Sequence, residues 1–179
     1  VNVGHLLELH EPVNTEHARR KILFVGSQNP INQYGITHFL DNIYPIIQRK
    51  IPGIELLIAG KICHDLKEIE GVKLLGEVES MKTAYDMADI IINPLIFGTG
   101  LKIKMIEALS YSKAVISTVV GAEGLEDGIG TSFLCADTPE EYVNAISDIL
   151  SNQKLFKSLS TNARSFAGSW NNKNASQLL

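Results

Sequence analysis

The chain has 179 residues, of which 45% are hydrophobic and 20% charged. It is therefore long enough for one well-packed domain, and its composition is unlike that of disordered or fibrous proteins. The formal net charge of -4 provides no basic stripe of the kind that binds nucleic acid, and we expect no nucleic-acid partner. The two cysteines, Cys63 and Cys135, lie far apart without companions at metal-ligand spacing, which indicates neither a disulfide framework nor a zinc site.

The first segment, residues 1–21, mixes polar side chains without a sustained period, and we expect a linker or the remnant of a preceding domain. The chain begins with Val1 rather than Met, which suggests a piece of a longer protein. No run approaches the ~20 apolar residues that span a bilayer, and no signal-peptide pattern is present. We expect a reducing cytoplasm as the location, and contact of the longer protein with the inner face of a membrane stays open.

Short apolar runs, several of them closed by glycine, predict strands that are buried on both faces of a parallel sheet. These runs cover residues 22–26, 54–59, 72–75, 90–92, 114–117 and 132–134. Helical spacing predicts helices over 35–49, with a bend at Pro45, and over 80–88, 101–111, 140–150 and 153–166. Thr138 and Glu141 have the spacing of a capping box. The alternation predicts an α/β fold, a doubly wound parallel sheet of about six strands with helices on both faces.

In such a sheet ligands bind outside the carboxyl ends of the strands, and the strand-to-helix loop at residues 94–100 carries the most informative pattern. Gly98 and Gly100 lack Cβ atoms, so backbone N–H groups there can approach an anion closely. Lys102 adds a positive charge at the helix start, where a cation is unfavourable unless an anion is present. The pattern favours a diphosphate.

Glu107 follows on one stripe of the same helix, about 10 Å from its start at ~1.5 Å of rise per residue. At that distance a carboxylate can accept hydrogen bonds from the two hydroxyls of a ribose. Spacing alone leaves an alternative open, in which Glu107 pairs with Lys102 or Lys104 in solvent.

The chain from Ile22 to about Trp170 resembles the C-terminal Rossmann-like domain of the GT-B-fold retaining glycosyltransferases, family four. The match is densest over residues 98–109, a Gly-Thr-Gly-Leu-Lys segment continued by Glu107 and Ala108, and it extends through 113–118 and 121–125. The resemblance implies one half of a GT-B fold over residues 22–170. It also implies that residues 171–179 start a segment crossing back to a missing N-terminal acceptor domain.

The resemblance implies the following roles for individual residues. Gly98, Thr99, Gly100 and Leu101 would bind the donor phosphates, Lys102 would neutralise them and Glu107 would hold the ribose, with Lys102 and Glu107 as the catalytic pair. Gly26 and Ser27 would line the facing wall, and the backbone of Glu77 and Val78 would meet the base.

Two features depart from the family pattern. The family often carries two glutamates eight positions apart, and the first would fall on Thr99. The loop after the first strand commonly holds a basic pair, whereas residues 29–34 contain no Arg or Lys. Phosphate binding would then be weaker or depend more on Lys102.

The expected function is that of a hexosyltransferase donor half, which binds a nucleoside-diphosphate sugar such as a UDP-sugar for carbohydrate biosynthesis and is inactive as an isolated domain. A non-catalytic nucleotide-binding module and a nucleotide-sugar epimerase of the same fold are the alternatives. No Asp-x-Asp pair and no histidine ligand spacing occurs, so we expect neither a metal nor a cofactor. We expect Tyr85 and Phe97 to pack in the core rather than against a base.

Overall fold

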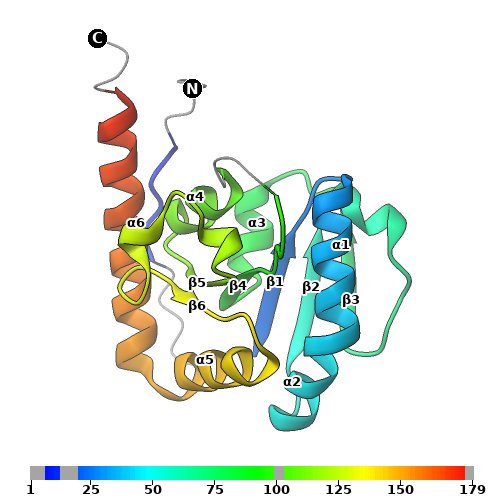
Figure 1. Cartoon of the computed structure of the whole chain (residues 1–179). Coiled ribbons are helices and arrows are strands. Elements are labelled where there is room, and N and C mark those ends of the chain that lie inside the picture. The colour runs from blue at the N-terminus through cyan, green and yellow to red at the C-terminus, as the bar shows by residue number, and fades with distance from the viewer. Residues whose placement is uncertain (1–6, 13–19, 99–102, 176–179) are drawn as a thin grey trace.

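The computed structural model describes residues 7–12, 20–98 and 103–175. Six parallel strands form one sheet in the order β3-β2-β1-β4-β5-β6, and helices cover both faces of it (Figure 1). The prediction of a doubly wound α/β fold with about six strands is confirmed.

The strands lie close to the predicted runs because their residues are buried on both faces of the sheet. In β1, Ile22 and Phe24 face one core and Leu23 faces the other, so no polar position interrupts the sequence. The strands are β1 Lys21–Val25, β2 Glu55–Ala59, β3 Val72–Gly76, β4 Ile90–Asn93, β5 Ala114–Ser117 and β6 Leu134–Cys135.

The helices divide between the two faces. One face is covered by α1 Pro30–His38, the π-helical turn η1 Phe39–Ile43, α2 Tyr44–Lys50 and α5 Pro139–Ser151. The other is covered by α3 Met81–Asp86, α4 Ile103–Ser110 and α6 Gln153–Ala175. Short 3-10 turns are η2 Lys61–Asp65, η3 Val120–Ala122 and η4 Glu126–Gly128.

The first helical stretch begins earlier than the predicted start at residue 35. Asn29 caps it, because its Oδ1 accepts a hydrogen bond from the Asn32 amide at 2.8 Å, and Pro30 occupies the first turn. The predicted irregularity near Pro45 takes the form of the π-helical turn η1, since proline has no N–H to donate to the carbonyl four residues earlier. The predicted Thr138–Glu141 capping box is confirmed.

The strand order places the topological switch point between β1 and β4. From β1 the chain passes to α1 on one face, and from β4 it passes to α4 on the other. The two connections separate at the carboxyl ends of these neighbouring strands, at the upper edge of the sheet in Figure 1. A crevice for a ligand is expected at this edge.

Residues 7–12 lie along α6 and the end of α4 (Figure 1). The backbone of Leu7 exchanges two hydrogen bonds with the Asn171 side chain, at 3.0 and 2.8 Å, and Glu11 forms a 2.7 Å ion pair with Arg164. The division of the chain at residue 21 into linker and domain stays a prediction.

Candidate functional site

Two glycines bring the ends of β1 and β2 into direct contact at the carboxyl edge of the sheet. A Cβ on Gly60 would lie 2.2 Å from the carbonyl oxygen of Gly26, and Gly60 has a φ of 101°. A Cβ on Gly26 would lie 2.8 Å from side-chain atoms of Ile62 and Phe24. Both positions therefore require glycine, because the two backbones and the Ile62 side chain pack too closely here for a Cβ atom.

Ser27 follows Gly26 and is the meeting point of three polar side chains. Its Oγ accepts hydrogen bonds from the side-chain amides of Asn29 at 3.0 Å and Asn32 at 3.1 Å, and Asn32 also donates to the Ser27 carbonyl. The third donor is the ammonium of Lys104, at 3.3 Å. Because Lys104 belongs to α4, this contact bridges the crevice between the β1 and β4 connections.

Lys104 and Glu107 form a half-buried pair on α4. Burial lowers the pKa of the Lys104 ammonium, an effect that the Glu107 carboxylate partly reverses. Burial likewise raises the pKa of Glu107, and the charge of Lys104 partly opposes this shift. For both groups the loss of hydration outweighs the charge of the other, so each pKa is shifted toward the neutral form.

Two tyrosines lie close enough to Glu107 for its charge to raise the pKa of their hydroxyls. Tyr85 is fully buried, its hydroxyl has no hydrogen-bond partner among the residues that the structure describes, and burial followed by the charge of Glu107 raises its pKa well above the ordinary value. Tyr111 stacks on Tyr85 with ring centroids 4.5 Å apart. The expectation that Tyr85 packs in the core is confirmed.

The loop that leaves β4 is held against α1 and against the β5 connection. Gly98 has a φ of 117°, and a Cβ there would lie 3.2 Å from Ile31 of α1. The Thr118 hydroxyl donates to the carbonyl of Leu95, and the Asn93 amide donates to the carbonyl of Gly121 at 2.9 Å. These contacts bring the predicted residue Gly98 to the crevice.

Four predicted phosphate-binding residues, Thr99, Gly100, Leu101 and Lys102, lie outside the described residues. The assignment of the donor phosphates to this segment remains a prediction.

Phe97, in the same loop, was expected in the core, and that expectation is wrong. Its side chain is 43% exposed and lies against the exposed ring of Tyr34, with the ring centroids 5.0 Å apart. The loop runs over the surface at the strand edge, so an aromatic side chain here does not reach either core.

The predicted base-contacting residues directly follow β3, which is the outermost strand on one side of the sheet. The Glu77 carboxylate is 58% exposed and lies 3.8 Å from the Lys61 ammonium and 3.9 Å from His64 Nε2. Val78 packs against the second core. Their backbone lies at the same edge as Gly26 and Gly60, and its contact with a base remains a prediction.

Lys104 and Asn32 are the polar residues of this crevice that sequence reasoning did not assign. Lys104 lies three residues before Glu107, a spacing that places two side chains side by side on a helix. Asn32 is 6% exposed, and buried asparagines are usually held in hydrogen bonds that orient a neighbour. Neither residue can be assigned from the sequence alone, because the spacing of Lys104 and the burial of Asn32 become informative only when the helix boundaries are known.

Within residues 7–12, 20–98 and 103–175, no three His, Cys, Asp or Glu side chains gather as a metal site would require. Among the helices described, none combines the length and the apolar character needed to cross a bilayer.

Similar solved structures share the fold. TarM of S. aureus superposes with a TM-score of 0.77 over 97% of this chain and 37% of its own length, at 13% identity. HepE of Anabaena, solved in complex with UDP, gives a TM-score of 0.69 over 89% of this chain and 48% of its own, at 14% identity. The C-terminal domain of LpcC from Francisella tularensis, a glycosyl transferase group 1 family protein, gives 0.63 over 86% of each chain, at 14% identity.

Sequence comparison gives the family. An uncharacterized 44.6 kDa protein in the cps region of Klebsiella pneumoniae is 29% identical over an alignment of 158 residues that covers 81% of this chain and 41% of that protein. The chain thus spans well under half the length of this curated relative. The family model for Glycosyl transferases group 1 matches residues 19–152. The chain belongs to the Glycosyl transferases group 1 family.

Proposed function

We propose that the chain is the C-terminal, donor-binding half of a retaining GT-B glycosyltransferase and that it binds a nucleoside-diphosphate sugar. The carrying observation is the contact of Lys104 with Ser27 across the switch point, with Glu107 beside it on α4. A cation and a carboxylate, three residues apart on one helix, match the order of groups in a nucleoside diphosphate. The cation suits the phosphates and the carboxylate suits the ribose hydroxyls.

Lys104 supplies a cation that the loop after β1 lacks. Residues 29–34 contain no Arg or Lys, yet the Lys104 ammonium reaches the same loop at Ser27. A bound diphosphate would accept hydrogen bonds from this ammonium and would restore the interactions that burial removed. Lys102 and the backbone of residues 98–101 remain proposed as further phosphate ligands.

The same groups give the proposed reaction an electrostatic basis. When the bond between the anomeric carbon and the diphosphate oxygen breaks, negative charge grows on the departing diphosphate. The ammonium groups of Lys102 and Lys104 and the N-terminal end of α4 would stabilise that charge. The acceptor would come from a second domain, and transfer itself would require the longer protein.

The bound ligands and the domain composition of three similar structures support this proposal. The structure of HepE contains UDP, one structure of a TarM mutant contains UDP with alpha-GlcNAc-glycerol, and the matching part of LpcC is a C-terminal domain. This chain covers 86% of that domain but less than half of HepE and TarM. The proportions agree with one half of a two-domain enzyme.

Calorimetric titration of the chain with UDP, GDP and ADP tests the proposal. We expect one nucleotide to bind with clear preference, and we expect Glu107→Gln to weaken its binding. Saturable binding of none of the three by a folded sample would contradict a donor site in this domain.

A further inference from the structure

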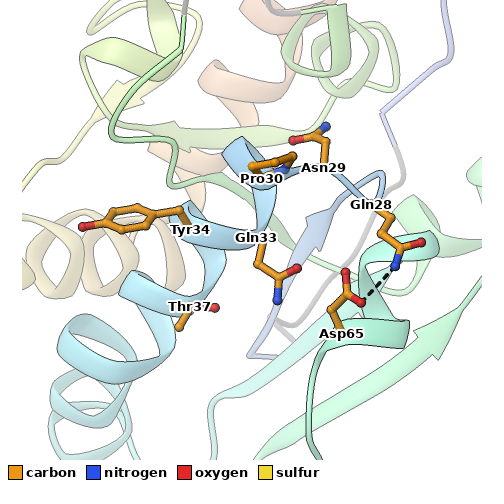
Figure 2. A pocket seen from close by; sticks show the side chains of 7 residues that line it. All are labelled: Gln28, Asn29, Pro30, Gln33, Tyr34, Thr37 and Asp65. Atoms are coloured by element: carbon orange, nitrogen blue, oxygen red, sulfur yellow. Dashed lines mark hydrogen bonds between the residues drawn. The ribbon is translucent and has the colours of Figure 1, made fainter.

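A groove lies beside α1, next to the loop that follows β1. It is an open groove of about 670 Å³ between α1 and the turn η2. In Figure 2, Gln33 and Thr37 project from α1 and Gln28 and Asp65 approach from the opposite wall. The volume lies within the range of about 300–1,000 Å³ that is usual for small-molecule sites.

The chemistry of the groove differs from that of the donor crevice. Its polar side chains are amides, a hydroxyl and one carboxylate, from Gln28, Asn29, Gln33, Thr37 and Asp65. Among the described residues that line it there is no lysine, arginine or histidine. A phosphate or another anion would therefore meet the carboxylate of Asp65 without a compensating cation, whereas a neutral polyhydroxyl ligand would meet both donors and acceptors.

The polar groups of the groove are held in place and are open to a ligand. Gln28 donates its Nε2–H to Asp65 at 2.9 Å, which joins the loop after β1 to η2 (Figure 2). The side chains of Gln33 and Thr37 form no hydrogen bond within the part of the chain that the structure describes. They stand one turn apart on α1, which Asn29 caps, so their spacing is fixed by a regular helix.

An exposed aromatic pair borders the groove. Tyr34 is 54% exposed and Phe97 is 43% exposed, and their rings are in contact at 5.0 Å. The ring of Tyr34 extends from α1 on the side away from Asp65 (Figure 2). An aromatic face next to amide and carboxylate groups is suited to a ring that is apolar on its C–H face and polar at its rim, as a sugar is.

We propose that this groove binds a short neutral oligosaccharide, with Gln28, Gln33, Thr37 and Asp65 bonding its hydroxyls and the Tyr34–Phe97 pair contacting an adjoining sugar ring. Gln28 and Asn29 follow Ser27 directly in the chain, so the groove opens beside the donor crevice. A role for this groove in holding a glycan beside the acceptor site of the second domain rests on the proposed function, whereas binding of a neutral saccharide does not.

The test is an amide NMR titration of the chain with four neutral disaccharides, namely maltose, cellobiose, lactose and diacetylchitobiose, followed by UDP. We expect at least one disaccharide to shift the side-chain amide signals of Gln28 and Gln33 and the backbone signal of Asp65. UDP should shift the signals of Gly26 and Ser27 instead.

Two substitutions localise the binding. Gln33→Ala and Asp65→Ala should each lower the affinity for the disaccharide by about tenfold, which corresponds to the loss of one hydrogen bond to a polar or charged partner. Gln153→Ala, which removes an exposed glutamine at the far end of the domain, should leave its affinity unchanged. The amide spectrum of each variant reports whether it is folded.

The outcomes separate this inference from the donor assignment. Saccharide shifts in the groove without any response to UDP, GDP or ADP would support the groove and contradict the proposed function. If UDP shifts the crevice signals and none of the four disaccharides shifts the groove signals, the inference is wrong. Binding that survives both Gln33→Ala and Asp65→Ala in folded protein would also overturn it.

Discussion

Two lysine–carboxylate pairs lie at the carboxyl edge of the same sheet, and they differ in burial. Lys61 and Glu77 are 3.8 Å apart, with side chains 63% and 58% exposed. Lys104 and Glu107 are half-buried, and burial shifts the pKa of each group toward its neutral form. The same chemical groups are thus exposed to solvent at one end of the edge and half-buried at the switch point.

The difference shows where a bound ligand would change the free energy most. An exposed pair is already hydrated and contributes about 0–1 kcal/mol. A half-buried pair has lost part of its hydration. A ligand that supplies hydrogen bonds and charge at that place replaces the lost interactions with water. The Lys104–Glu107 pair is therefore the part of the edge where substitutions should alter binding.

The largest effect is expected from Glu107→Gln. Replacing the carboxylate removes a charged acceptor of ribose hydroxyl groups, so the affinity for the preferred nucleoside diphosphate should fall by about thirtyfold, or roughly 2 kcal/mol. Calorimetry measures the change. Glu68→Gln, which alters an exposed glutamate away from the crevice, is the matched control and should bind as the wild type does.

Lys104→Met should weaken the same nucleotide by about tenfold, because it removes one charge-assisted hydrogen bond to phosphate. Binding of the nucleoside without phosphates should stay the same, which places the effect on the diphosphate. Lys61→Met tests the comparison directly and should change the nucleotide affinity by less than about twofold. Equal losses in the two lysine variants would mean that burial does not distinguish the pairs.

The pH dependence of binding should be set by both members of the buried pair. Affinity should fall at alkaline pH as Lys104 loses its proton below the ordinary lysine range, and at acid pH as Glu107 gains one above the ordinary glutamate range. A nucleotide sugar is the ligand of choice, since its diphosphate has no ionisation near neutrality. Lys104→Met should abolish the alkaline decline and Glu107→Gln the acid one, whereas unchanged profiles would contradict both assignments.

The smallest effect concerns stability. The pKa of Glu107 is raised in the folded state, so stability falls as the pH rises from the unfolded-state pKa to the folded-state pKa. The cost is complete above the folded-state pKa, and it is absent at acid pH, where both states are protonated. Glu107→Gln should therefore raise the free energy of unfolding at neutral pH by less than about 1 kcal/mol, and should not raise it at acid pH. Urea titrations at the two pH values measure this, and a loss of stability at neutral pH would show that the carboxylate serves the fold rather than a ligand.

The sheet was predictable because its central strands, β1, β2, β4 and β5, are largely buried apolar runs, and glycines such as Gly26 and Gly60 mark the strand ends where backbones meet. The crevice followed from strand order alone. The contact between Lys104 and Ser27 was not predictable, because it joins residues 77 positions apart and depends on how α1 and α4 flank the switch point. Gln28 and Asp65 meet for the same kind of reason, and no local pattern in the sequence indicates it.

The most direct measurement is a map of UDP, GDP and ADP binding by amide NMR of the 179-residue chain. We predict that the preferred nucleotide shifts the signals of Gly26, Ser27 and the residues around Glu107, and that these shifts vanish in Glu107→Gln at the same ligand concentration. Shifts confined to another part of the domain, or none with any of the three nucleotides, would contradict a donor site at the switch point.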